Sequence, residues 1–209
     1  MKENYKILPN GVIAQNKYFS TPQVYNQKYI DTRYNSYGEK GMQMAYLRLG
    51  YLLGNLKSTP NSILDIGYGN GDFLKVCTDI IPECYGSDIS GYPVPSKVQF
   101  IEDIYSKHFD VVSFFDVLEH FEDINFVKDL KCTYIIISVP FCHFFSEEWF
   151  LNWKHRRPDE HLFHFNDKSL NNFFSEMGFD VVVQSHIEDI IRTPTDNTPN
   201  ILTGIYKKR

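Results

Sequence analysis

The sequence predicts an α/β fold: a seven-stranded, mostly parallel sheet with helices on both faces and an antiparallel hairpin at its C-terminal end. Short apolar segments alternate with helical patterns along most of the chain, which is typical of a parallel sheet. The last two apolar segments are joined by turn residues without a helix, which fits a hairpin. The expected strands cover residues 63–66, 83–89, 98–101, 109–115, 133–139, 181–183 and 201–206.

The chain divides into a main domain over residues 41–209 and an N-terminal arm or lid over residues 1–40. Its 209 residues suit one globular domain with a substantial core. The first 37 residues are polar and carry a tyrosine series: Tyr25, Tyr29, Tyr34 and Tyr37. These rings either pack on the core or cover a binding site as a lid. From Gly41 to Leu53 the apolar pattern predicts an amphipathic helix that leads into the first strand.

A glycine-rich loop follows the first strand. Gly67, Gly69 and Gly71 alternate with other residues, and Asp72 begins a helical pattern. Glycines at these positions let the backbone turn sharply and let a ligand approach where a Cβ would collide. The first free N–H groups of the helix point toward that ligand. The segment therefore predicts a cofactor cradle, although a glycine-rich turn without a ligand is the simpler alternative.

The spacing of the glycines indicates which cofactor to expect. The dinucleotide fingerprint is G-x-G-x-x-G, but here the pattern is G-x-G-x-G, and Asp72 stands where the third glycine would be. Asp65 precedes the loop, and a carboxylate there suits a cationic amino-acid ligand better than a pyrophosphate. A nicotinamide-dependent oxidoreductase is thus the weaker interpretation.

The D-x-G-x-G-x-G element resembles motif I of the class I S-adenosylmethionine-dependent methyltransferases. The order of elements over roughly residues 40–209 and the G-F-x-V entry into the sixth strand are similar to the same family. The resemblance implies a Rossmann-like fold and S-adenosylmethionine as cofactor. It also implies that Asp65, Gly67, Gly69 and Gly71 lie against the methionine part of that cofactor.

Three later strands end in further candidate cofactor residues. Asp88 lies 17 residues beyond Gly71, close to the spacing of a ribose-binding acid, and a carboxylate accepts two hydroxyl hydrogen bonds. A turn aspartate beside Ser90 and Gly91 is the alternative. Asp103 follows the third strand, where the resemblance implies an acid near the adenine amino group. Phe115 and Asp116 end the fourth strand, which should face the cofactor.

Asp116, Glu119 and His120 are the candidates for catalysis. At i, i+3 and i+4 they would share one face of a helical turn. The segment resembles the E-x-x-E-H metal motif of ubiquinone-pathway O-methyltransferases and small-RNA 2′-O-methyltransferases. Because aspartate is shorter than glutamate, we favour a metal-free site in which His120 accepts a proton or orients the acceptor. Glu119 would lie beside it.

A less regular segment over residues 141–165 is rich in rings, histidines and charges. It follows the carboxyl end of a strand, where open α/β sheets bind ligands. His161 is a second candidate catalytic residue in this segment. His161 and His164 would face the site together only in a helical turn; in an extended segment they would point to opposite sides. Helices are also expected over residues 121–130 and, capped by Asn166 or Asp167, up to Gly178.

Composition limits the partners. The formal net charge of −5 argues against a nucleic-acid surface, and four cysteines without zinc spacing indicate buried thiols in a reducing cytoplasm. No apolar run is long enough to span a bilayer, and the N-terminus has no signal-peptide pattern. We therefore expect a cytoplasmic S-adenosylmethionine-dependent methyltransferase that acts on O or N of a small or medium-sized acceptor. The sequence is also compatible with a cofactor-binding protein without catalysis and, less well, with a nucleic-acid-modifying enzyme.

Overall fold

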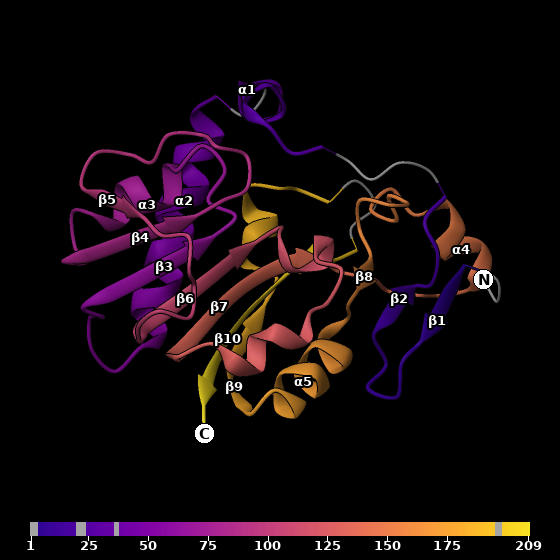
Figure 1. Cartoon of the computed structure of the whole chain (residues 1–209). Helices are drawn as coiled ribbons and strands as arrows, with labels where there is room; N and C mark the ends of the chain where they lie inside the picture. Colours follow the sequence, from indigo (N-terminus) through magenta and orange to yellow (C-terminus); the bar gives the residue numbers. More distant parts are fainter. Residues whose placement is uncertain (1–3, 20–23, 36–37, 195–197) are drawn as a thin grey trace.

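The computed structural model describes residues 4–19, 24–35, 38–194 and 198–209. In this part of the chain, seven strands form the main sheet in the order β5-β4-β3-β6-β7-β10-β9, as Figure 1 shows. Only β10 runs antiparallel to its neighbours β7 and β9. The predicted fold class is confirmed. The strands are β3 (Ser62–Ile66), β4 (Glu83–Ser87), β5 (Val98–Phe100), β6 (Phe109–Phe115), β7 (Cys132–Pro140), β9 (Phe179–Ser185) and β10 (Ile201–Lys208).

Helices cover both faces of this sheet. Successive strand residues point to opposite sides, so neighbouring residues of one strand pack against different helices. Ile63 packs in one cluster with residues of α2 (Glu39–Asn55) and α3 (Asp72–Cys77). Its neighbour Leu64 packs in a second cluster with residues of α5 (Asp167–Glu176). The predicted cap of α5 is confirmed, since the Ser169 N–H donates to Asn166 Oδ1 at 2.8 Å. Four buried thiols, one from each cysteine, lie in the described chain.

The prediction of a helix over residues 121–130 is wrong. The structure has two 3₁₀ turns instead, η1 (Leu118–His120) and η2 (Asn125–Asp129). The Asp123 side chain accepts the Asn125 N–H at 2.8 Å, and this local bond competes with the helical hydrogen-bond ladder. The apolar residues of the segment are nevertheless buried in the core, among them Ile124 and Val127. Their burial explains why the apolar pattern resembled that of a helix.

The N-terminal residues contribute a second, smaller sheet. Strands β1 (Tyr5–Ile7) and β2 (Ile13–Gln15) form a hairpin, and β2 pairs with β8 (Phe163–His164). Figure 1 shows this hairpin beside β8 and α4 (Glu147–Asn152). The short helix α1 (Gln27–Asn35) precedes α2. Of the tyrosine series, Tyr37 and the side chains of Tyr29 and Tyr34 lie outside the described residues. Among the described helices, none has the length and apolar character needed to cross a membrane.

Candidate active site

A cavity of about 1030 Å³ opens at the carboxyl ends of the central strands. It lies where open α/β sheets bind ligands. Most of the candidate residues line it: Asp65, Gly67, Gly69, Asp88, Asp103, Phe115, Asp116, His120 and His161. Gly71 and Glu119 are not among the described residues that line it, although each is next in sequence to a lining residue, Asn70 and His120 respectively. The cavity thus brings together candidate residues that lie far apart in the sequence.

The glycine loop between β3 and α3 requires residues without a side chain. Gly67, Gly69 and Gly71 have φ angles of 74°, 58° and 79°, in the left-handed region that favours glycine. A Cβ on Gly67 would lie 2.5 Å from Val117 Cγ2, and one on Gly71 would lie 2.5 Å from Pro95 Cγ. The loop is therefore held tightly against its own chain, and it leaves the cavity above β3 open for a cofactor.

Asp88 fixes the loop to the end of β4. Its Oδ2 accepts the Gly69 N–H at 2.9 Å, and its Oδ1 accepts the Ser90 N–H at 2.7 Å. Each carboxylate oxygen has a further lone pair, so Asp88 can hold the loop and still accept hydroxyl hydrogen bonds from a ligand. Asp103 accepts the Tyr105 N–H at 2.9 Å and also lines the cavity.

Asp65 lies under the loop in a different setting. Its side chain is 3% exposed and accepts a hydrogen bond from Ser113 Oγ at 2.7 Å. Burial raises its pKa from 3.8 to about 7, although the Ser113 bond and the Arg48 charge act in the opposite direction. A positively charged ligand in the cavity would favour the ionised form. Asp65 is therefore suited to a cationic ligand.

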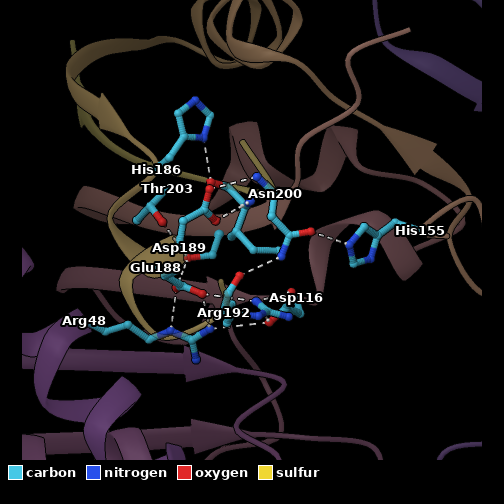
Figure 2. Close-up of polar contacts among 11 residues, drawn as sticks. Arg48, Asp116, His155, His186, Glu188, Asp189, Arg192, Asn200 and Thr203 are labelled. Carbon is cyan, nitrogen blue, oxygen red and sulfur yellow. Dashed lines mark hydrogen bonds and ion pairs between the residues drawn. The ribbon is translucent and has the colours of Figure 1, made fainter. Parts of the chain in front are cut away.

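A buried charge network borders the same cavity and was not foreseen from the sequence. Glu188 in η3 (Ile187–Ile190) accepts from Arg48 Nε at 2.7 Å and from Arg192 Nη1 at 3.1 Å. Arg192 Nη1 also donates to the two oxygens of Asp116 at 2.9 and 2.8 Å. Figure 2 shows Glu188 and Asp116 joined in this way by Arg48 and Arg192. Arg48 comes from α2, so the network joins distant parts of the chain.

Asp116 lines the cavity, but its side chain belongs to this charge network and not to a group with Glu119 and His120. Its φ of 57° is left-handed, so it does not share a helical face with Glu119 and His120, and that prediction is wrong. Burial alone would raise its pKa, but the charges of Arg192 and Arg48 outweigh burial and hold the pKa below its usual value. The carboxylate remains ionised between the two arginines.

Glu119, His120 and His161 lie together at the other end of η1. The His120 and His161 rings meet edge to face, with centroids 4.7 Å apart. His120 Nδ1 is 2.8 Å from the Tyr25 hydroxyl, and His161 Nδ1 is 2.8 Å from the His155 carbonyl oxygen. Burial lowers the pKa of both imidazoles, and that of His161 falls to about 2. Both rings are therefore neutral at pH 7.

His164 points away from this group, as expected for an extended segment. Its ring packs against Tyr5, Phe150 and Trp153. His164 belongs to the core beneath the small sheet, and His161 is the histidine of this pair that faces the cavity.

Residues 34–184 match the model of a protein family described as a methyltransferase domain. The chain belongs to this methyltransferase family. It is a class I S-adenosylmethionine-dependent methyltransferase with a Rossmann-like fold, so the resemblance seen in the D-x-G-x-G-x-G element is confirmed. Membership of the family favours this enzyme class over the nicotinamide-dependent alternative. Comparison with curated proteins finds no match.

Solved structures of methyltransferases have a similar fold. One is 1,6-didemethyltoxoflavin-N1-methyltransferase from Burkholderia thailandensis, with bound 1,6-didemethyltoxoflavin and S-adenosylhomocysteine: the TM-score is 0.60, the identity is 14%, and 98% of this chain and 99% of that chain are covered. Another is magnesium protoporphyrin IX methyltransferase from Synechocystis PCC 6803, with a TM-score of 0.59, 14% identity, and coverage of 88% and 96%. These likenesses show the fold of the methyltransferase but not its acceptor.

Proposed function

We propose that this methyltransferase transfers a methyl group to an oxygen or nitrogen atom of a small or medium-sized acceptor. The observation that carries the proposal is one cavity of about 1030 Å³ that is lined by the candidate cofactor residues and by two histidines. The two solved methyltransferases named above, whose names give small-molecule acceptors, support it by analogy. The acidic net charge of −5 is consistent with a non-nucleic-acid acceptor.

The chain's own residues would divide the cavity into a cofactor side and an acceptor side. Asp88 would accept the ribose hydroxyls, and Asp103 would lie near the adenine. Asp65 and the glycine loop would hold the methionine part, with Phe115 and Asp116 at the end of β6 between cofactor and acceptor. When bound, S-adenosylmethionine supplies an activated methyl group on a sulfonium. The protein then needs chiefly to orient the acceptor and to exclude water.

His120, His161 and Glu119 would serve the acceptor. The His155 carbonyl can only accept a hydrogen bond, so His161 Nδ1 carries the proton and Nε2 keeps its lone pair. We expect His120 to accept the acceptor's proton and His161 to orient the acceptor group. Glu119 would lie behind the two imidazole rings and influence them through its charge.

The segment before α2 would cover the acceptor as a lid. Tyr25 and Ile30 line the cavity, and the Tyr25 hydroxyl contacts His120. A ring on a loop in this position can exclude water from the reacting groups while the loop admits ligands by moving.

Calorimetry and product analysis test the proposal. Asp88→Ala should weaken S-adenosylmethionine binding more than about tenfold, because its hydrogen bonds to ribose would be lost. Asp79→Ala removes an exposed carboxylate after α3 and should leave affinity unchanged. S-adenosylhomocysteine release with panels of small hydroxyl and amine compounds then identifies the acceptor. Unchanged affinity in folded Asp88→Ala would remove Asp88 from the site, and methylation of RNA or protein alone would overturn the small acceptor.

A further inference from the structure

His155 lines the large cavity together with His120 and His161. Its ring is half-buried and packs edge to face against Trp153, with centroids 5.5 Å apart. Trp153 borders a second, smaller cavity of about 210 Å³, but among the described residues that line this smaller cavity His155 is absent. The open part of the His155 ring therefore faces the acceptor side of the large cavity.

The orientation of the Asn200 amide fixes the tautomer of His155. Asn200 Nδ2 donates to the Arg192 carbonyl oxygen at 3.1 Å, and a carbonyl oxygen can only accept. Asn200 Oδ1 is then the amide atom that lies 2.9 Å from His155 Nε2. Since this oxygen also only accepts, Nε2 carries the proton and Nδ1 keeps its lone pair. Burial lowers the pKa of His155 to about 4, so the ring is neutral at pH 7.

Asn200 is itself held in place by η3. Asp189 Oδ2 accepts the Asn200 N–H at 2.8 Å, and Asp189 Oδ1 accepts the N–H of the next residue, Ile201, at 2.9 Å. Figure 2 shows the chain of contacts that runs from Asp189 through Asn200 to His155. Glu188, next to Asp189 in η3, belongs to the buried charge network. The His155 ring is thus oriented by hydrogen bonds that lead back to this network.

The lone pair on His155 Nδ1 requires a donor when the site is closed. Within the described part of the chain, no residue donates to this atom. Two guanidinium groups line the same cavity, but both are paired with carboxylates. Arg192 lies 2.8 Å from Asp116, and Arg157 lies 2.8 Å from Glu160. In a site from which water is excluded, an acceptor atom without a donor is costly, and the bound acceptor molecule can supply the donor.

We propose that His155 selects acceptors that carry a second polar hydrogen, and this step rests on the function proposed above. The reacting atom loses its proton to His120 and gains the methyl group, whereas the second group keeps its proton and donates it to His155 Nδ1 in a hydrogen bond. The acceptor class is thus a diol, an amino alcohol or a diamine. His155 determines specificity, and Asn200 and Asp189 position it.

Nitrogen NMR of the histidine side chains tests the tautomer without any acceptor. In the wild type at pH 7 we expect a protonated Nε2 and an unprotonated Nδ1 for His155, whose signals are assigned by their loss in His155→Leu. Asn200→Leu removes the oxygen that selects this tautomer, so both tautomers should be populated. A protonated Nδ1 in the wild type, or an unchanged tautomer in folded Asn200→Leu, would overturn the proposal.

Matched pairs of small compounds test the specificity. In each pair, one polar hydrogen of the first compound is replaced by a methyl group in the second, as in catechol and guaiacol or in ethanolamine and its methyl ether. From S-adenosylhomocysteine release we expect kcat/KM to be at least about tenfold higher for the first compound. His155→Leu should lose this preference. His155→Asn should recover part of it, because an amide oxygen can accept in place of Nδ1.

His143→Leu is the matched control. His143 Nε2 donates to the carbonyl oxygen of Pro199, next to Asn200, at 2.8 Å, but among the described residues His143 lines the smaller cavity and not the large one. The control loosens the same segment without touching the acceptor, so it should keep the preference of the wild type. A loss of preference in His143→Leu as large as that in His155→Leu would count against a direct contact with the acceptor.

The outcomes separate this proposal from the function on which it rests. Equal rates within the pairs, or a preference that survives in folded His155→Leu, would overturn the role of His155 and leave the proposed function intact. Methylation of no small compound, with S-adenosylmethionine still bound, would overturn the proposed function and the role of His155 with it. S-adenosylmethionine affinity of each variant shows that the cofactor side is still folded.

Discussion

Asp65 and Asp88 border the same cavity, but different groups surround their carboxylates. Asp88 accepts two backbone N–H groups. Asp65 is 3% exposed and accepts one hydroxyl, so the cost of burying its charge is poorly compensated. The protonation of Asp65 should therefore change near neutral pH in the free enzyme.

This property makes the stability of the free enzyme depend on pH. The pKa of Asp65 is about 7 in the folded chain against 3.8 as its ordinary value, so between these values the folded state binds more protons than the unfolded state. Stability should then fall as the pH rises through this window, with a contribution approaching about 1.4 kcal/mol per pH unit. Asp65→Asn should remove that contribution. Urea unfolding at pH 5 and pH 8 measures it, and parallel pH profiles of the two proteins would contradict it.

The glycine loop is the element on which the proposed cofactor site depends. Its three glycines have left-handed φ angles, and at Gly67 and Gly71 a Cβ would also make close contacts, so the two causes of strain can be separated. Gly67 has a φ of 74° and would bring a Cβ within 2.5 Å of Val117, whereas Gly178 has a φ of 90° and open space around it. The two positions form a matched pair for substitution.

Gly67→Ala should cost more stability than Gly178→Ala. Both substitutions add the strain of a left-handed residue, about 1–2 kcal/mol, but only Gly67→Ala also forces Val117 to move. Gly67→Ala should therefore also weaken S-adenosylmethionine binding, and adding Val117→Ala should recover part of the lost stability. Denaturant unfolding and calorimetry check this. Equal costs at the two glycines would show that the contact with Val117 is unimportant.

The local sequence pattern was sufficient to predict the glycine loop. It was insufficient to predict the arrangement of the segment after β6. The strand, the glycines and the helix beyond them are all determined by neighbouring residues, so the loop was found from the sequence. Asp116 depends on Arg48 and Arg192, which lie 68 and 76 residues away along the chain. No periodicity in the sequence indicates such partners. The prediction that Asp116 shares a helical face with Glu119 and His120 was wrong for that reason. The meeting of His120 with His161 likewise depends on the tertiary fold.

At the scale of the whole molecule, polar contacts between distant segments keep the site in place. The N-terminal hairpin is joined to the segment before β8, since Gln15 Nε2 donates to Asp159 Oδ1 at 2.7 Å and the Asp159 N–H donates to Gln15 Oε1 at 3.0 Å. On the opposite side, Glu188 joins α2 to the end of the sheet through Arg48, and Ser138 of β7 also donates to it. Glu188 is fully buried, so each hydrogen-bond donor is needed to compensate the charge of its carboxylate.

Arg48→Met should therefore destabilise the whole fold. It keeps the apolar stem but leaves Glu188 with fewer compensating charges, and removal of one partner from a buried ion pair costs about 3–5 kcal/mol. Burial would raise the pKa of Glu188, but Arg48 first and Arg192 next lower it below its ordinary value. The stabilisation from Glu188 is thus present above its unfolded pKa and is lost in acid, so the cost of Arg48→Met should shrink as the pH falls below about 4.5.

The double variant Arg48→Met/Glu188→Gln tests the physical cause. If the cost comes from an uncompensated charge, the double variant should be more stable than Arg48→Met alone at pH 7, because the charge has been removed together with its partner. Lys75→Met on the exposed side of α3 should change stability by less than about 0.5 kcal/mol. Urea unfolding of the wild type and the three variants at pH 7 and pH 4 measures these differences and their pH dependence. A double variant that is no more stable than Arg48→Met would mean that lost packing of Arg48 over the Phe115 ring, 4.1 Å away, is the larger cause.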